Sequence, residues 1–107
     1  MQAIILCGGL STRLGDITKD TPKILLEIGT RTILDIQLEL LKGAGVEQVI
    51  LASGHLHQVL YDEVGESRSG VKIQYAQEER QLGTGGAIKN AMRHISMAPF
   101  FVLNGDI

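Results

Sequence analysis

The sequence predicts an α/β fold with a doubly wound, mainly parallel sheet of the Rossmann-like kind. Short apolar runs alternate with longer amphipathic segments along the 107 residues, a pattern typical of parallel strands joined by right-handed helical crossovers. The apolar runs lack a polar face, as expected for strands covered by helices on both sides. Glycines and polar residues follow several of the runs, at the strand ends where such sheets bind ligands.

Length and composition favour a single domain over residues 1–107. A chain of this length with 44% hydrophobic residues can form one core and is too short for two. A formal net charge of −2 argues against a nucleic-acid or anionic-membrane surface. The start of the chain does not resemble a signal peptide, and no apolar run approaches the ~20 residues needed to cross a bilayer. We therefore expect a cytoplasmic protein.

The first half of the chain predicts one strand, one irregular segment and one helix. Residues 3–7 form an apolar run that ends at two glycines, which indicates a buried strand entering a tight turn. Residues 10–26 are polar and irregular, and Pro22 argues against a helix there. Residues 32–42 predict a helix with a wide buried face. Its apolar positions are Ile33, Leu34, Ile36, Leu38, Leu40 and Leu41.

The second half predicts strands and helices in alternation. The strands are expected over residues 46–52, 71–76 and 100–103, and the helices over residues 55–64 and 84–95. His55 and His57 are expected to be solvated residues at a helix start, because no cysteine or carboxylate nearby completes a metal site. The chain stops just after a predicted central strand, where a natural domain rarely ends. We therefore expect a truncated form, the front part of a longer domain.

Three polar segments fall at the carboxyl ends of predicted strands: residues 8–14, 83–86 and 104–106. Since these ends meet at one edge of a doubly wound sheet, we expect the three segments to share a ligand. In the first of them, Gly8 and Gly9 let the backbone turn tightly and bring N–H groups close to that ligand.

The side chains around the first segment suit a polyphosphate. Ser11 and Thr12 add hydroxyl donors, and Arg13 adds a planar fork of donors that matches phosphate oxygens. Lys23 could add a point charge to the same group. The single cysteine, Cys7, lies in the apolar run before the glycines and is expected to be a buried thiol rather than a nucleophile.

These motifs in this order resemble the sugar-1-phosphate nucleotidylyltransferases, which include the mannose-, heptose- and glucose-1-phosphate enzymes. The resemblance spans the whole chain and covers only the N-terminal portion of such an enzyme. The motifs are Gly8-Gly9-x-x-Thr12-Arg13-Leu14, Pro22-Lys23, Leu82-Gly83-Thr84-Gly85-Gly86-Ala87 and Asn104-Gly105-Asp106.

The resemblance implies a nucleotidyltransferase fold and a role for each motif. The loop from Leu6 to Arg13 would wrap a nucleoside triphosphate, with Arg13 and Lys23 as the catalytic cations on its phosphates. Glu78, Gly83 and Thr84 would bind the nucleoside, and Asp106 would hold Mg²⁺. A sugar 1-phosphate oxygen then attacks the α-phosphorus and pyrophosphate leaves, a reaction that needs positioning and charge neutralisation. The 107 residues alone are expected to bind nucleotide and not to turn over.

Glu78 favours GTP among the triphosphates. A carboxylate only accepts hydrogen bonds, and the Watson–Crick edge of guanine offers two adjacent donors. Uracil would instead present an acceptor oxygen to the carboxylate. Many uracil- or thymine-binding relatives have glutamine at the position of Glu78.

Two departures from the family pattern leave alternatives open. Ser11 stands where glycine is usual, and Ile24 follows Pro22-Lys23 where proline is common. The chain could instead be a non-catalytic nucleotide-binding regulatory module. It could also belong to the molybdenum-cofactor nucleotidyltransferases, which share a Gly-Gly-x-Ser-x-Arg segment and would use a pterin partner.

Overall fold

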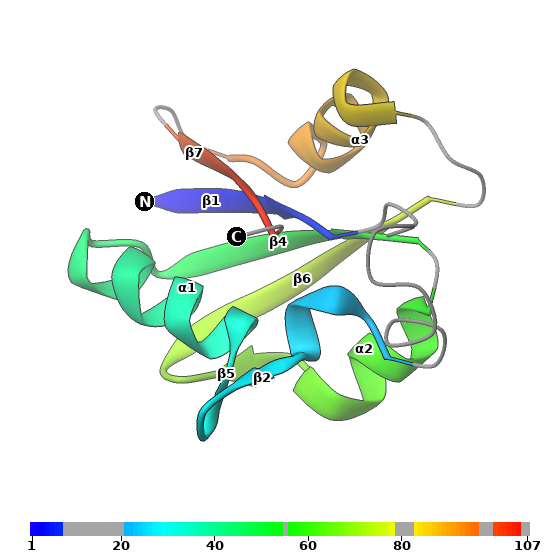
Figure 1. Ribbon diagram of the computed structural model, residues 1–107. Coiled ribbons are helices and arrows are strands. Elements are labelled where there is room, and N and C mark those ends of the chain that lie inside the picture. The colour runs from blue at the N-terminus through cyan, green and yellow to red at the C-terminus, as the bar shows by residue number, and fades with distance from the viewer. Residues whose placement is uncertain (8–20, 55, 79–82, 97–99, 106–107) are drawn as a thin grey trace.

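A computed structural model of the chain describes residues 1–7, 21–54, 56–78, 83–96 and 100–105, without the side chains of residues 83 and 84. Its main sheet has the strand order β5-β6-β4-β1-β7, and a separate hairpin pairs β2 with β3 (Figure 1). The strands of the main sheet are β1 (Gln2–Leu6), β4 (Gln48–Ser53), β5 (Ser67–Arg68), β6 (Val71–Gln77) and β7 (Phe100–Asn104). All pair in parallel except β5, which runs antiparallel to β6.

Helices cover both faces of this sheet. On one side lie α1 (Ile33–Gly43), α2 (His57–Val64) and the short 3₁₀ helix η2 (Lys23–Leu25), and on the other lies α3 (Gly83–Met92) (Figure 1). Alternate strand residues divide between two cores: Ile5 packs into the α1 and α2 side, whereas Ile4 packs into the α3 side. The predicted doubly wound, mainly parallel sheet is therefore confirmed.

The sequence prediction is wrong in three places. Residues 23–25 form η2 within the segment expected to be irregular, and Pro22 directly precedes this turn. The β2–β3 hairpin (Glu27–Ile28 and Arg31–Thr32) and β5 were not expected, because two-residue strands carry almost no local pattern. All strands were expected to be apolar and covered on both faces, but β6 and β7 differ. Lys72 and Gln74 of β6 are exposed, and β7 lies at the edge of the described sheet.

Helix α1 begins at a complete capping box. The Thr32 hydroxyl accepts from the Asp35 backbone N–H at 3.0 Å, and the Asp35 carboxylate accepts from the Thr32 N–H at 3.4 Å. Such a box satisfies donors at the helix start and stabilises it by about 1 kcal/mol. The buried face is narrower than predicted: Leu40 is 66% exposed, and Gln37 takes a place on the buried stripe at 2% exposure.

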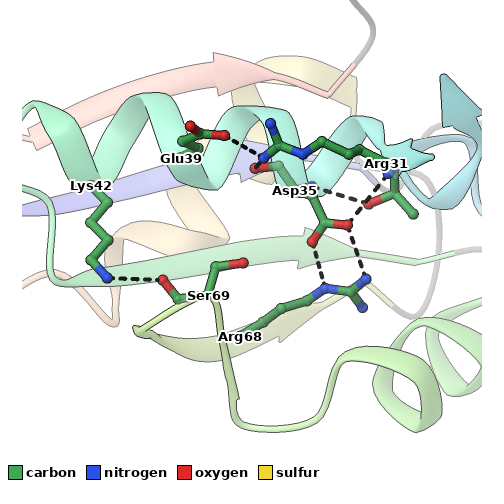
Figure 2. Close-up of polar contacts among 7 residues, drawn as sticks. Arg31, Asp35, Glu39, Lys42, Arg68 and Ser69 are labelled. Atoms are coloured by element: carbon green, nitrogen blue, oxygen red, sulfur yellow. Dashed lines mark hydrogen bonds and ion pairs between the residues drawn. The ribbon is translucent and has the colours of Figure 1, made fainter. Parts of the chain in front are cut away.

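A polar cluster fastens α1 to the β5–β6 turn (Figure 2). The Arg68 guanidinium donates from Nε to Asp35 Oδ1 at 2.8 Å and from Nη2 to Asp35 Oδ2 at 3.2 Å. This forked pair lowers the pKa of the Asp35 carboxyl, and its side-chain hydrogen bond is the largest cause. From the same helix α1, Lys42 donates through Nζ to the carbonyl of Ser69 in the turn. On the exposed face of α1, Glu39 forms an ion pair with Arg31.

The strand order reverses between β1 and β7. From β1 the chain moves through β4 to β6 by way of α1 and α2, and then returns past β1 to β7 by way of α3. In open α/β sheets the crevice beyond the carboxyl ends of the strands at such a reversal is the usual ligand site. Within the described residues, no helix is long and apolar enough to span a bilayer.

Candidate functional site

Backbone hydrogen bonds align four strand ends at the carboxyl edge of the sheet. The Gly105 N–H donates to the Leu6 carbonyl at 2.9 Å, joining β7 to β1 across the strand-order reversal. Cys7 N–H donates to the Ala52 carbonyl at 3.0 Å, and Glu78 N–H donates to the Ser53 carbonyl at 2.7 Å. Residues that follow β7, β1 and β6 therefore lie in one row with the end of β4.

Gly105 fits closely against the start of the first loop. It is buried, and a Cβ at this position would lie 3.0 Å from the Leu6 carbonyl oxygen and 3.2 Å from Ile24 Cδ1. Only glycine fits this backbone approach without a shift of its neighbours. We call the contact between Leu6, Ile24, Asn104 and Gly105 the strand-end junction.

Helix η2 places Lys23 in the region of the candidate site. Its neighbour Ile24 is 1% exposed, packs in the α1-side core and reaches the strand-end junction. The turn is closed by hydrogen bonds from Leu25 N–H to the Pro22 carbonyl and from Leu26 N–H to the Lys23 carbonyl. Because Ile24 is buried, it holds the backbone of the adjacent, partly buried Lys23 beside the end of β1.

Glu78 and Cys7 lie close enough to interact. Burial raises the pKa of the Cys7 thiol to about 12, and the charge of Glu78 adds to the shift. The thiol therefore stays protonated at neutral pH, as the expectation of an unreactive cysteine requires. Its Sγ donates to the Ala52 carbonyl at 3.4 Å. The carboxylate predicted to read the nucleobase thus lies at the same edge of the sheet as Cys7, which follows β1.

A buried serine and a half-buried histidine support the end of β4. Ser53 is 1% exposed, and its Oγ lies 2.7 Å from His57 Nδ1. The imidazole also packs edge-on against Tyr75, with ring centroids 5.5 Å apart. His57 is the first residue of α2, as expected, but it is half-buried and hydrogen-bonded to Ser53 rather than solvated. Because Glu78 is bonded to the Ser53 carbonyl, this pair stabilises the backbone that carries Glu78.

Gln37 ties helix α1 to the end of β7. Its Nε2 donates to the Asn104 carbonyl at 3.1 Å, and the side chain is 2% exposed. Its Oε1 is buried and has no hydrogen-bond partner among the described residues. An unsatisfied buried acceptor costs about 1–3 kcal/mol, so packing alone gives no reason for glutamine at this position.

The remaining predicted residues divide into two groups. Gly83 and Thr84 are the first residues of α3, which begins one residue earlier than predicted. Six positions lie outside the described residues: Gly8, Gly9, Ser11, Thr12, Arg13 and Asp106. Across the described part of the chain, no three His, Cys, Asp or Glu side chains are grouped as a metal site.

The chain matches the family model "Nucleotidyl transferase" over residues 2–107. This match covers almost every residue. The chain belongs to the nucleotidyl transferase family.

Relatives within this family are similar in sequence over the same region of the chain. The chain is 44% identical over 106 residues to D-glycero-alpha-D-manno-heptose 1-phosphate guanylyltransferase of Campylobacter jejuni, covering 99% of the chain and 48% of the relative. It is 41% identical over 111 residues to the mannose-1-phosphate guanylyltransferase catalytic subunit beta of Danio rerio, covering all of the chain and 31% of the relative. The chain thus spans half or less of the length of these relatives.

Two solved structures share the fold. The structure of HddC from Yersinia pseudotuberculosis complexed with GMP-PN has 37% sequence identity and a TM-score of 0.85, covering 98% of this chain and 47% of that one. A UDP-glucose pyrophosphorylase complexed with UDP-glucose, at 24% identity and a TM-score of 0.85, covers 98% of this chain and 45% of its own. That second likeness shows the fold alone.

Sequence reasoning missed Gln37, Ser53 and His57. Gln37 had a usable signal, because it shares the i, i+3, i+4, i+7 spacing of the buried stripe with its apolar neighbours Leu34, Leu38 and Leu41. Ser53 ends a buried strand, and its partner His57 could be recognised only from coordinates.

Proposed function

We propose that this chain forms the nucleotide-binding part of an enzyme that transfers GMP from GTP to a sugar 1-phosphate. The observation that carries the proposal is the strand-end junction at the strand-order reversal. The Gly105–Leu6 hydrogen bond brings the start of the first loop beside the turn that leads to Asp106. Both segments then flank the crevice where doubly wound sheets bind ligands. A cytoplasmic location belongs to the same proposal, because both substrates are small soluble phosphates.

The row of strand ends has the dimensions of a nucleotide. Glu78 follows β6, and Gly105 follows β7, three strands away in the order β6-β4-β1-β7. At a spacing of about 4.8 Å between strands, the two positions lie roughly 14 Å apart along the edge. We infer that the base lies toward Glu78 and the phosphates toward the strand-end junction.

The nucleobase in the proposal is guanine. Glu78 can accept from the two adjacent donors of the guanine edge, and its backbone is fixed by the bond to Ser53. Support comes from the guanylyltransferase names of the relatives and from the GMP-PN complex. A sugar 1-phosphate, such as a heptose or mannose 1-phosphate, is taken from the same names.

The proposed reaction requires that both substrates are bound in position and that the charge on the phosphates is neutralised. A phosphate oxygen of the sugar substrate forms a bond to the α-phosphorus, and the bond between that phosphorus and the bridging oxygen of pyrophosphate breaks. Arg13 and Lys23 are assigned to the phosphate oxygens, where fixed positive charge stabilises the developing negative charge. Backbone N–H groups of residues 8–12 would hold the phosphates in line.

Asp106 is the residue assigned to Mg²⁺, which when bound would neutralise charge on the phosphates. The described residues next to it fit this role, because Gly105 is fixed against Leu6 and Asn104 is held by Gln37. A single carboxylate is compatible with Mg²⁺, which often binds through one or two carboxylates together with substrate phosphates.

Calorimetric titration of the chain with GTP, with and without Mg²⁺, tests the proposal. We expect binding that strengthens with Mg²⁺ and that loses this dependence in Asp106→Ala. Binding that is indifferent to both would favour a regulatory module instead. Binding of a pterin in preference to any triphosphate would favour the molybdenum-cofactor branch.

The base assignment has its own test in Glu78→Gln. A bidentate pair between carboxylate and guanine contributes about 1–3 kcal/mol to discrimination, so the preference for GTP over UTP should fall roughly 5- to 150-fold. Gln77→Glu is the control, since Gln77 is the exposed residue next to Glu78. An unchanged ratio of GTP to UTP affinities in Glu78→Gln would exclude guanine reading by this carboxylate.

A further inference from the structure

The side chain of Gln37 has a contact that the fold does not require. It comes from the buried face of α1 and donates to the Asn104 carbonyl, at the last residue of β7. Parallel strands hold β7 to β1 without it, through pairing from Gln2 with Phe100 to Leu6 with Asn104. A leucine or methionine here would fill the same space without leaving an oxygen unpaired.

The location of the contact is specific. Asn104 directly precedes Gly105, whose N–H is bonded to Leu6, and Gly105 precedes Asp106. Within the described residues the backbone that enters this turn is thus held from two sides, by β1 and by α1. We propose that Gln37 is a positioning residue, whose carboxamide fixes the strand-end junction and so the turn that leads to Asp106.

This inference rests on the proposed function, in which Asp106 meets the metal and the nucleotide phosphates. The buried, unpaired Oε1 is its second support. Buried polar groups in native proteins are almost always paired, and an exception calls for a reason beyond packing. The reason proposed here is that an amide donor is needed at the Asn104 carbonyl, which an apolar side chain could not supply.

Gln37→Met separates positioning from a purely structural role. Methionine keeps the length and volume and removes both the donor and the unpaired acceptor. We expect the urea midpoint of the variant to equal or exceed that of the wild type, because an unsatisfied buried oxygen disappears. In the same protein, hydrogen exchange at the Gly105 amide should quicken at least about fivefold relative to the amides of α1, the factor that corresponds to one lost hydrogen bond.

The functional readout is the affinity for Mn²⁺ in the presence of GTP, followed by electron paramagnetic resonance of the free ion. Loss of an outer partner of a metal site typically weakens metal binding 10- to 100-fold, and we expect about 10-fold for Gln37→Met. Gln58→Met is the matched control, since Gln58 is exposed on α2 and donates to Asp62 on the same helix, away from the strand-end junction. It should change neither exchange nor Mn²⁺ affinity.

Outcomes for the two proposals can be told apart. Wild-type protein that binds no GTP would refute the proposed function, while the exchange experiment would still report on Gln37. Unchanged exchange at Gly105 in Gln37→Met, or faster exchange with wild-type Mn²⁺ affinity, would overturn the positioning role. Should the methionine variant not fold, Gln37→Asn, which keeps the amide and shortens its reach, is measured in the same way against the same limits.

Discussion

Gly105→Ala tests the strand-end junction directly. The φ angle of Gly105 lies outside the left-handed region, so an alanine can adopt the backbone conformation and the penalty is steric. The new methyl group would lie 3.0 Å from the Leu6 carbonyl oxygen, 3.2 Å from Ile24 Cδ1 and 3.6 Å from Ile5 Cγ2. None of these can give way cheaply, because Leu6 belongs to the β1 ladder and both isoleucines are buried.

Overpacking of this kind costs about 1–3 kcal/mol. The lower flexibility of alanine in the unfolded chain offsets about 0.4–1 kcal/mol of that cost. We therefore expect the free energy of unfolding to fall by about 1–2 kcal/mol, measured by urea denaturation with an unchanged dependence on denaturant. The stabilisation of the protein by added GTP and Mg²⁺ should also decrease, since the turn to Asp106 must shift.

Gly43→Ala is the control for this prediction. Gly43 is the last residue of α1, and a Cβ there would have nothing within 4 Å. Alanine should stabilise the helix by about 0.5–1 kcal/mol. A Gly105→Ala protein that is as stable as wild type, or that gains stability as Gly43→Ala does, would refute the close packing of β7 against β1.

Three further predictions follow from side chains away from the junction. Leu34→Ala should cost about 2–5 kcal/mol in a urea titration, because Leu34 is fully buried, whereas Leu40→Ala on the same helix should change stability by less than about 0.5 kcal/mol. Equal effects would show that the register of α1 is wrong. Asp35→Asn should cost about 1 kcal/mol or less at pH 7, since Asp35 and Arg68 are partly exposed. Because Arg68 lowers the pKa of Asp35, this stabilisation is present above the ordinary carboxyl pKa and is lost as the pH falls below it; a difference that does not shrink as the pH is lowered would contradict the pairing. The Cys7 thiol, with a pKa raised to about 12, should react with iodoacetamide at pH 8 far more slowly in native protein than in urea. The contribution of the protonated thiol to the stability of the fold should be lost as the pH rises from about 9 to 12. Equal alkylation rates in the two conditions would refute its burial.

The fold was predictable because its long elements carry strong local patterns. The apolar run at residues 3–7 and the helical spacing at residues 32–42 each match an observed element within about one residue at either end. The β2–β3 hairpin and β5 were not predictable, since cross-strand hydrogen bonds define two-residue strands and sequence pattern does not. Leu40 was assigned to the core because it is apolar, but the other residues of the stripe already fill the contact with the sheet.

The location of the candidate site could be predicted from the sequence more fully than the side-chain contacts that support it. The rule that carboxyl ends of parallel strands share an edge was enough to expect residues 8–14, 83–86 and 104–106 at one edge of the sheet, whereas the roles of Leu6 and Glu78 followed from the family resemblance. The pairing of Ser53 with His57 depends on the rotamers of two residues on different elements. The hydrogen bond from Gln37 to Asn104 depends on how α1 is placed relative to the end of β7. Both are tertiary facts, for which the sequence offers only permissive residue types.

The strand-end junction also has a consequence for how the protein acquires its function. Leu6 and Gly105 are far apart in the sequence, so their contact closes a long loop. Contacts of such long sequence separation tend to appear late in folding, because closing a long loop is entropically unfavourable. If the chain binds nucleotide as proposed, its nucleotide affinity should therefore appear late during refolding, and measuring that affinity would show whether a preparation is fully native.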